Sequence, residues 1–400
     1  MSVNKFHYLS GGADRYYFEW SEVLEKKGHE VVFFSMRHER NPATPYAKYF
    51  VDEVEFFNTG MRNLPAMAIR VLYSWQARKR IELLIRDTTP EIAHLHNIAH
   101  QLSPSILDSL KRYHLPIVQT VHDYKFGCPT YSFFVQGQVC ERCKGGHYYN
   151  VVLQRCNRGS LAASLLNCLE MYFHRWIGIY NNVDLFIAPS NFVREKMIEY
   201  GISSERVVWV PHFIAIDQYV PEYTHDDYFL FFGRLAPFKG LSTLLSAMRF
   251  VKESQLYIVG EGELREELES YAEEQDIENV AFLGYKSGEE LKSIIRNSMF
   301  TIIPSEWYEV LGFVILESFA LGTPVLAANI GGMPELMDPS VDGLLFEPGS
   351  VADLVEKIQY LLANRQLLAE MGRQARAKIE REYDGETHYE RMMEIYGGLL

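Results

Sequence analysis

The sequence predicts an α/β fold with two domains, each built around a parallel sheet. The chain has 400 residues, which is more than one ordinary hydrophobic core contains. Short apolar runs alternate along it with amphipathic stretches, as they do in βαβ units. Between two series of such units, residues 211–227 carry two prolines, several acids and few apolar anchors. We therefore interpret residues 213–227 as a linker between two α/β domains.

The first domain is predicted over residues 1–212 and the second over residues 228–384. Strands of the first are expected at residues 31–34, 92–95, 117–121, 185–188 and 207–210, after an opening strand that ends near Val3. Strands of the second are expected at residues 228–232, 255–259, 280–283, 300–303, 324–327 and 344–346.

Composition and the pattern of apolar residues favour a soluble globular protein over a membrane-spanning, secreted or general nucleic-acid-binding one. Hydrophobic residues make up 48% and charged residues 23%, which is the balance of a soluble globular protein. No run approaches the roughly 18 apolar residues of a membrane span, and residues 1–6 lack the apolar core of a signal peptide, so a cytoplasmic location is expected. The net charge of −13 argues against a general nucleic-acid-binding face, which would be basic.

Charge is divided unevenly between the two halves of the chain. Residues 1–212 hold 24 Lys and Arg against 20 Asp and Glu, whereas residues 213–400 hold 15 against 32. The net charge of +4 in the front half would suit an anionic acceptor or a lipid surface. Ordinary variation of surface charge is the alternative.

The segment 233–240 is a candidate phosphate site. It follows the apolar run 228–232 and precedes a helical pattern over 242–251, so Arg234 and Lys239 lie on a glycine-flanked strand-to-helix loop. Backbone amides and cations at such a place favour a phosphate, and fixed cations stabilise the charge that gathers on a leaving diphosphate. The chain contains no Asp-x-Asp motif, so the two cations are expected to take the role of a metal ion.

Glu309 and Glu317 lie on another strand-to-helix turn. The pattern predicts a helix over 310–321, with Glu309 before it and Glu317 two turns into it. Carboxylates accept hydrogen bonds from sugar and ribose hydroxyls. Two cations for a diphosphate and two acids for hydroxyl groups together indicate a nucleotide-sugar site.

The ordered set of motifs resembles retaining glycosyltransferases of family 4, which have the GT-B fold. The matching residues are Gly11-Gly12-Ala13, His122-Asp123, Ala188-Pro189-Ser190, Gly233-Arg234, Lys239-Gly240, Val259-Gly260-Glu261-Gly262, Phe282-Leu283-Gly284, Pro304-Ser305-Glu306, Glu309, Glu317, Gly322-Thr323-Pro324-Val325, Gly331-Gly332, Pro334-Glu335 and Asp342-Gly343. The resemblance implies two Rossmann-like domains facing across a cleft. It also implies that a terminal helix, 385–400, crosses back to complete the first domain.

The resemblance further implies which residues act. His122, Glu309, Arg234 and Lys239 are expected to be catalytic, with His122 near the transferred sugar, Glu309 on its hydroxyls and the two cations on the diphosphate. Donor-binding residues are expected at Gly12, Gly233, Glu261, Gly284, Leu311, Gly312, Phe313, Val314 and Glu317, with Glu317 on the ribose. Transfer would proceed by front-face attack, in which a phosphate oxygen takes the acceptor proton.

Three features depart from the family pattern. His212-Phe213 stands where most relatives have Asn-Gly, and Val310-Leu311-Gly312-Phe313 replaces a run of acidic residue, Gly, Phe and Gly. The opening strand is short, and we interpret the N-terminus as trimmed or as beginning upstream. We still expect a helix to begin after Glu309 despite these changes.

Cys128, Cys140, Cys143 and Cys156 lie in an insert at residues 124–158, with a Cys-x-x-Cys at its centre. The spacing resembles a looped zinc site more than a disulfide framework, and an ion would order a segment with little periodicity. We therefore predict a structural zinc, with free thiols and disulfides as alternatives. Cys168 lies in a helical pattern and is predicted to be buried.

Two stretches are candidates for membrane contact. Residues 63–86 combine apolar positions with Arg70, Arg78, Lys79 and Arg80, as a helix on an anionic membrane does. A core helix with a solvated basic face is the favoured alternative there. Residues 161–180 are apolar and aromatic, and a packed helix is favoured over a membrane contact.

Together, these observations predict a metal-independent retaining glycosyltransferase that moves a sugar from a UDP- or GDP-sugar to an acceptor hydroxyl. Its role would be in cell-surface polysaccharide or glycolipid synthesis. The partners would be the nucleotide-sugar donor and a glycan or lipid-linked acceptor, with peripheral contact at the inner face of the membrane and no nucleic acid. Two alternatives stay open: another GT-B enzyme, such as a nucleotide-sugar epimerase or a phosphorylase, and a non-catalytic sugar-nucleotide-binding scaffold.

Overall fold

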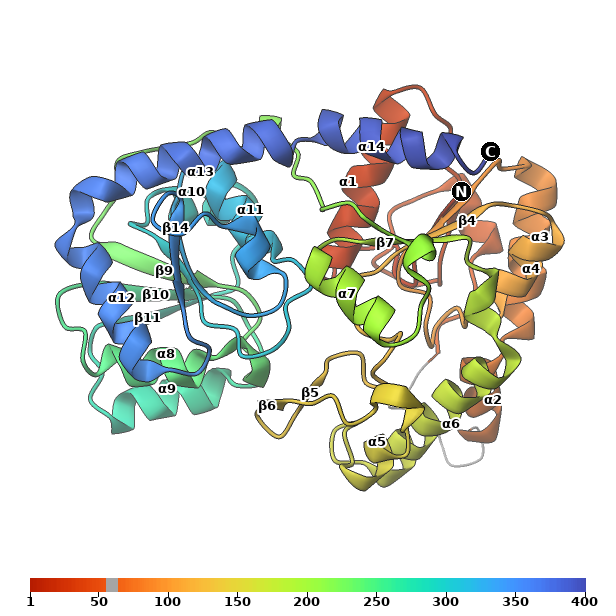
Figure 1. Cartoon of the computed structure of the whole chain (residues 1–400), viewed down its shortest axis with the longest axis horizontal. Coiled ribbons are helices and arrows are strands. Elements are labelled where there is room, and N and C mark those ends of the chain that lie inside the picture. The colour runs from red at the N-terminus through yellow and green to blue at the C-terminus, as the bar shows by residue number, and fades with distance from the viewer. Residues whose placement is uncertain (55–63) are drawn as a thin grey trace. The chain divides into compact units, whose positions relative to one another are not determined.

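The computed structural model describes residues 1–54 and 64–400 and contains two six-stranded parallel sheets (Figure 1). The chain divides into two compact units. Unit 1 consists of Met1–Phe133, Glu141–Val210 and Tyr389–Leu400, and unit 2 consists of Phe134–Cys140 and Pro211–His388. The predicted α/β class with two Rossmann-like sheets is confirmed.

The sheet of unit 1 has the strand order β2-β1-β3-β4-β7-β8. Its strands are β1 (Ser2–Val3), β2 (Phe33–Phe34), β3 (Ala93–Leu95), β4 (Ile117–Thr120), β7 (Leu185–Ala188) and β8 (Val207–Trp209). Its helices are α1 (Gly12–Lys26), α2 (Leu64–Leu72), α3 (Trp75–Thr88), α4 (Ile106–Arg112), α5 (Asn150–Leu153), α6 (Leu161–Ile177) and α7 (Asn191–Glu199). A short antiparallel hairpin, β5 (Phe134–Val135) and β6 (Gln138–Val139), interrupts the chain between β4 and α5.

The C-terminal end of the chain packs against the sheet of unit 1. The last helix, α14 (Gly385–Gly397), carries Tyr396, whose hydroxyl lies 2.6 Å from Nδ1 of His94 on β3. The indole Nε1 of Trp20 on α1 donates to the same hydroxyl at 3.1 Å. These buried hydrogen bonds join three segments that lie far apart in the sequence, and they satisfy polar groups that would otherwise destabilise the core.

The sheet of unit 2 has the order β11-β10-β9-β12-β13-β14, with all strands parallel. Its strands are β9 (Tyr228–Phe232), β10 (Gln255–Val259), β11 (Val280–Gly284), β12 (Thr301–Ile303), β13 (Val325–Ala328) and β14 (Gly343–Phe346). Its helices are α8 (Leu241–Met248), α9 (Arg265–Glu274), α10 (Gly288–Arg296), α11 (Phe313–Ala320), α12 (Val351–Ala363) and α13 (Leu368–Glu382). In Figure 1, α8, α9 and α12 lie on one side of this sheet, and α10, α11 and α13 lie on the other.

The central strands of unit 2 are apolar at every position because helices cover both faces of the sheet. All five residues of β9 are buried, and the rings of Phe229 and Phe300 stack at 4.9 Å between centroids. The segment 213–227, interpreted as a linker, is attached to this core, since Ile214 and Tyr219 are buried in it.

Two predicted helices differ from the structure. The helix expected over 310–321 begins at Phe313, because Gly312 has a φ of 111° and lies outside the helical region. Glu317 therefore lies one turn into the helix, not two. The stretch 64–88 forms two helices, because Ser74 caps α3 by accepting a hydrogen bond from the backbone N–H of Ala77. Position 63 lies outside the described residues. Within the part of the chain that the structure describes, every helix is too short or too polar to cross a bilayer.

Candidate functional site

The strand order of unit 2 places a topological switch point between β9 and β12. β10 and β11 extend the sheet from one side of β9, and β12, β13 and β14 extend it from the other. Open parallel sheets bind ligands outside the carboxyl ends of their strands at such a point. The loops that leave it are residues 233–240, with Arg234 and Lys239, and residues 304–312, with Glu309.

These two loops touch along their backbones. The N–H of Glu306 donates to the carbonyl oxygen of Phe238 at 2.9 Å. Gly240 has a φ of 68°, and a Cβ at this position would lie 1.8 Å from the carbonyl oxygen of Pro304. Glycine is thus required at 240 both for its backbone conformation and for the close approach of the second loop.

Lys239 and Glu309 form an ion pair where the loops meet. The distance from Lys239 Nζ to Glu309 Oε1 is 2.5 Å, and the hydroxyl of Ser305 donates to the same oxygen at 2.7 Å. The rings of Phe238 and Trp307 lie 4.6 Å apart, and both lie within 6 Å of the ammonium. These rings limit the access of water, so the two side chains are only 19% and 11% exposed.

The surroundings of Glu309 keep it ionised. Burial raises the pKa of its carboxyl group, but the charge of Lys239 and the hydrogen bonds from Lys239 and Ser305 outweigh that effect and hold the pKa below its ordinary value. The site therefore presents a carboxylate and an ammonium side by side at neutral pH. Such a pair can accept hydrogen bonds from hydroxyl groups and attract an anion at the same place.

Other predicted donor-binding residues lie at the same edge of the sheet. Gly233 follows β9, Glu261 follows β10, and Gly284 ends β11. A Cβ at Gly260 would lie 1.9 Å from the carbonyl oxygen of Gly233, so the first two of these loops also meet closely. Arg234 is exposed beside them. The structure brings these residues to the carboxyl ends of three adjacent strands.

The start of α11 completes this edge. Gly312 precedes the helix, Leu311 is buried, and Phe313 and Val314 form the first turn. The first N–H groups of a helix have no partner within it and favour an anion. Glu317 is half-buried one turn further along.

Arg265 is a residue of this edge that the sequence analysis missed. Its guanidinium pairs with the carboxylates of Glu261 and, at 2.9 Å, Glu269. A Cβ at Gly284 would lie 3.3 Å from its Nη1, so the side chain lies beside the end of β11. The signal was present in the sequence, because the acids stand four residues on either side of Arg265 in a helical pattern.

In unit 1, His122 lies just beyond the carboxyl end of β4, as the apolar run before it predicted. It is half-buried, and its Nε2 lies 3.1 Å from Nδ1 of His96. Burial and, to a smaller degree, the charge of Lys5 lower the pKa of His122 to about 3. The imidazole is therefore neutral at physiological pH and a weak base.

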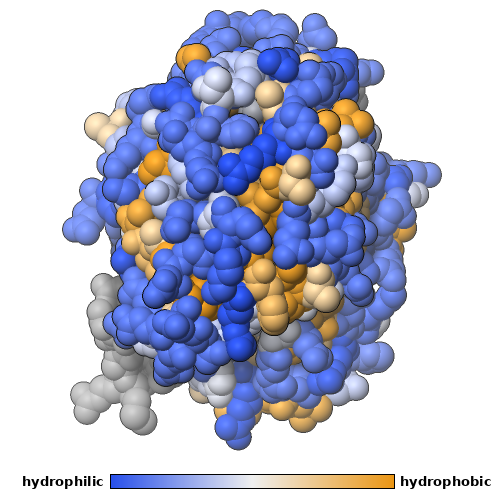
Figure 2. Space-filling model, turned by 90° about the vertical axis from the view of Figure 1, so that its left-hand side faces the viewer, coloured by the Kyte–Doolittle hydropathy of each residue, from blue (hydrophilic) through white to orange (hydrophobic). Residues whose placement is uncertain are grey.

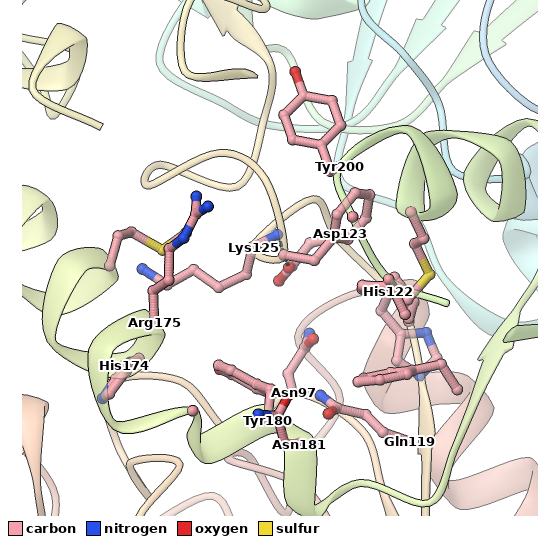
Figure 3. Close-up of a pocket in the computed structure, with 18 of the residues that line it drawn as sticks. Asn97, Gln119, His122, Asp123, Lys125, His174, Arg175, Tyr180, Asn181 and Tyr200 are labelled. Atoms are coloured by element: carbon pink, nitrogen blue, oxygen red, sulfur yellow. Dashed lines mark hydrogen bonds between the residues drawn. The ribbon is translucent and has the colours of Figure 1, made fainter. Parts of the chain in front are cut away.

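A cavity of about 310 Å³ adjoins His122 within unit 1 (Figure 3). Figure 3 shows His122 and Gln119 on one side of it and His174 and Arg175 of α6 on the other. Further polar side chains line it, namely Asn97, Asp123, Lys125, Tyr180, Asn181 and Tyr200. Apolar side chains such as Phe126 and Met171 also line it. A concave pocket that combines apolar walls with convergent polar groups is a usual form of a small-molecule site.

A buried ion pair joins the loop after β4 to α6. Lys125 Nζ lies 2.6 Å from Glu170 Oε2, and His100 Nε2 lies 3.1 Å from the same oxygen. Burial raises the pKa of Glu170, but the charges of Lys125 and His100 outweigh it and lower that pKa well below its ordinary value. Because Glu170 is completely buried, removing one partner would leave an uncompensated charge. The pair therefore fixes α6 beside the cavity.

Gly12 begins α1, and Gly11 precedes it with an extended backbone. A Cβ at Gly11 would meet no atom within 4 Å, so the space above this loop is open. The carboxylate of Asp14 accepts hydrogen bonds from Asn4 at 2.8 Å and from the N–H of Ser10 at 3.2 Å, which ties the loop to the end of β1.

The four cysteines predicted to bind zinc do not form a ligand cluster. Cys143 and Cys156 pack with the predicted buried Cys168 in a small apolar cluster, and Cys128 is buried elsewhere. Cys140 follows β6 and belongs to unit 2, whereas the other three belong to unit 1. Residues 1–54 and 64–400 contain no group of three or more His, Cys, Asp or Glu that could hold a metal ion. The geometry does not confirm the zinc site.

Two family descriptions match the sequence. Glycosyltransferase Family 4 matches residues 10–218, and Glycosyl transferases group 1 matches residues 214–378. The first match covers most of unit 1, and the second includes both loops of the switch point in unit 2.

Individual relatives align with parts of the chain. The uncharacterized glycosyltransferase MJ1178 of Methanocaldococcus jannaschii is 29% identical over 217 residues, which are 54% of this chain and 59% of that relative. A GDP-mannose-dependent monoacylated alpha-(1-6)-phosphatidylinositol monomannoside mannosyltransferase of Corynebacterium glutamicum is 34% identical over 173 residues, which are 41% of this chain and 45% of that relative. The chain thus spans less than two thirds of either relative.

A solved structure, Anabaena HepE in complex with UDP-glucose, has a TM-score of 0.69 with this chain at 17% identity. The superposition covers 99% of this chain and 98% of HepE. At this identity the likeness concerns the fold. The family description matches more than half of the chain, and the motifs lie where the fold binds ligands. The chain therefore belongs to glycosyltransferase family 4.

Proposed function

We propose that this glycosyltransferase is metal-independent and retaining, and that it moves a sugar from a UDP- or GDP-sugar to an acceptor hydroxyl. The observation that carries the proposal is the Lys239–Glu309 pair at the switch point of unit 2. Lys239 offers a cation to a diphosphate, and Glu309 beside it offers a carboxylate to sugar hydroxyls. HepE was solved with UDP-glucose, and the C. glutamicum relative is described as GDP-mannose-dependent, which supports a nucleotide-sugar donor.

In the proposed complex, Lys239 and Arg234 bind the diphosphate and stabilise its charge as it leaves. The first backbone N–H groups of α11 also stabilise the negative charge of the diphosphate. Glu309 accepts hydrogen bonds from the donor sugar, and Glu317 accepts them from the ribose. The loops with Glu261 and Gly284 hold the base.

The reaction proposed is a front-face substitution. The acceptor oxygen bonds to the anomeric carbon on the side from which the diphosphate leaves, the bond from that carbon to the diphosphate breaks, and a phosphate oxygen takes the hydroxyl proton. His122 fits a scheme without a protein base, because a pKa of about 3 makes it too weak a base for the task. We assign His122 to binding of the transferred sugar.

The acceptor is proposed to be a glycan or a lipid-linked sugar in cell-surface polysaccharide or glycolipid synthesis, used by a cytoplasmic enzyme with peripheral membrane contact. The printed name of the C. glutamicum relative includes a phosphatidylinositol glycolipid, which supports a lipid-linked acceptor. The basic balance of residues 1–212 supports an anionic one.

The test is binding and slow hydrolysis of UDP-, GDP- and ADP-sugars in the presence of EDTA. We expect one nucleotide to stabilise the protein against heat and to be hydrolysed, and Lys239→Ala to weaken its binding by about 10- to 100-fold. Lys357→Ala is the matched control, because Lys357 pairs with Asp353 on α12 away from the loops. Binding without turnover with any acceptor would favour the scaffold alternative, and no binding of any donor would overturn the proposal.

A further inference from the structure

Helix α6 buries mostly polar side chains and exposes apolar ones, which is the reverse of an ordinary surface helix. Its buried residues are Ser164, Asn167, Cys168, Glu170, Met171 and His174, four of which are polar, whereas its exposed residues are apolar or aromatic except for Arg175. Leu161, Leu165, Leu169, Tyr172 and Trp176 are 53%, 48%, 51%, 39% and 83% exposed. Their spacing of four, four, three and four residues puts them on one face of the helix. We call these five residues the α6 stripe.

The polar face of α6 is held in place by specific contacts. Asn167 Nδ2 donates to the carbonyl oxygen of Pro129 at 2.8 Å, and His174 Nε2 lies 2.8 Å from the carbonyl oxygen of Leu72. Glu170 pairs with Lys125. Turning the helix to bury the stripe would break all three interactions, so these contacts keep the stripe on the outside.

An ordinary surface helix of this chain has the opposite pattern. On α12, Leu354, Ile358 and Leu361 are buried, and Glu356 and Gln359 are exposed. Figure 2 views the molecule from the side on which α9 and α12 lie, and mostly hydrophilic side chains cover that face. An exposed apolar stripe of several turns marks a surface that meets something other than water.

The sequence that flanks the α6 stripe is basic. From residue 142 to residue 180 the sequence holds five Lys or Arg, and Glu170, which is buried, is its only acid. Arg155 and Arg158, just before the helix, are exposed, and so is Leu153 of α5 at 68%. An apolar helix face with a basic margin is the composition of helices that lie in the headgroup region of an anionic bilayer.

The same helix forms a wall of the cavity beside His122. Met171, His174 and Arg175 line that cavity from α6, as Figure 3 shows for His174 and Arg175. Met171 and His174 lie on the side of the helix away from the stripe. One helix thus presents an apolar face to the exterior and polar groups to the cavity.

We infer that α6 docks this enzyme on an anionic lipid surface through its apolar stripe and that the cavity takes the polar head of a membrane-borne acceptor. The inference rests on the proposed transferase function and names the class of its acceptor. A second copy of the chain is a less suitable occupant of the stripe, because two-fold pairing through it would bring the basic margins of both copies together.

The test measures the fraction of protein that floats with vesicles of phosphatidylcholine, with and without phosphatidylglycerol. We expect binding to the anionic vesicles that weakens with salt, and a loss of about tenfold or more in Leu165→Glu/Leu169→Glu. Arg155→Glu/Arg158→Glu should weaken binding to vesicles that contain phosphatidylglycerol and should leave binding to pure phosphatidylcholine vesicles unchanged. The matched control is Phe250→Glu, because Phe250 is a 61% exposed aromatic residue of unit 2.

Donor hydrolysis without vesicles separates this inference from the proposed function. It should be unchanged in Leu165→Glu/Leu169→Glu, whereas its absence from the wild type would contradict the transferase proposal alone. Vesicle binding that is absent in the wild type, or equal in the wild type and the Glu variant, would overturn the inference. Light scattering that shows a wild-type dimer and a monomeric Glu variant, without vesicle binding, would assign the stripe to an interface between copies and would also overturn it.

Discussion

The switch-point region of unit 2 and the α6 region of unit 1 each hold a shielded ion pair, but they place their apolar side chains in opposite ways. In unit 2, apolar strands fill the core, and Lys239 and Glu309 stand at the carboxyl edge of the sheet. In α6, ionic and polar side chains lie inside, and Leu165, Leu169 and Trp176 lie outside. The first region follows the rule for a protein in water, and the second departs from it. The difference indicates that the switch-point region faces water, whereas the α6 stripe faces an apolar partner.

The largest effect is expected at the ion pair that defines the first region. Glu309→Ala should lower the turnover number by about 100- to 1000-fold, because Lys239 loses its partner and the donor sugar loses an acceptor group. Steady-state assays with the identified donor measure it. Glu356→Ala on exposed α12 should behave as the wild type. Near-normal turnover in Glu309→Ala would remove this carboxylate from the site and break the comparison.

The next effect concerns the close contact of the two loops. Gly240→Ala should lower the free energy of unfolding by about 3 kcal/mol, because a positive φ is strained and the new Cβ meets the carbonyl oxygen of Pro304. Gly288→Ala is the control, with a φ of 58° and no atom within 4 Å of the added Cβ, and should cost about 1 kcal/mol. Urea unfolding compares them. Equal losses would show that the loops have room to separate.

In unit 1, the neutral state of His122 should make the stability of the fold depend on pH. Its pKa falls from 6.5 to about 3 on folding, so the unfolded chain binds the proton more readily between these values. The stabilisation is complete above pH 6.5 and is lost as the pH falls toward 3. The melting temperature of His122→Gln should decline less steeply with acid than that of the wild type. Burial also lowers the pKa of His7, to about 4. His7 therefore contributes part of the loss of melting temperature with acid in both the wild type and His122→Gln. Identical slopes would contradict the burial of His122.

The smallest effect is expected from metal removal. Since the cysteines of the insert form no ligand cluster, EDTA should leave the melting temperature and the vesicle binding of the protein unchanged. Calorimetry and elemental analysis of the purified protein check this. About one zinc per chain, together with a melting temperature that falls on chelation, would restore the structural zinc and make the insert a metal-ordered region.

The strands and the candidate donor residues were predictable because each depends on a short local pattern. Apolar runs such as 228–232 define buried strands, and a glycine after a strand defines the turn that carries the next functional residue. Because parallel strands all end at one edge, Lys239 and Glu309 could be assigned to one site from their places after two strands. The helix start at Phe313 was missed because only the backbone shows that Gly312 leaves the helical region.

The α6 stripe was not predictable in the same way. A run of leucines and aromatic residues with polar residues between them has the same periodicity whichever face is buried. The sequence analysis favoured a packed helix over residues 161–180, and the structure packs the helix through its polar side. The cysteine spacing could not establish a zinc site for a related reason, because spacing along a loop does not determine whether four sulfur atoms converge.

The sequence by itself determined the α/β class, most strand positions, the membership of family 4 and the charged residues of the switch-point loops. These follow from burial and turn chemistry within a few neighbouring residues. Only the tertiary structure decided which face of α6 is buried, that Lys125 and Glu170 pair across 45 positions, and that the cysteines form no ligand group in the described part of the chain. Such features depend on contacts between distant segments, whose free energy no local pattern contains.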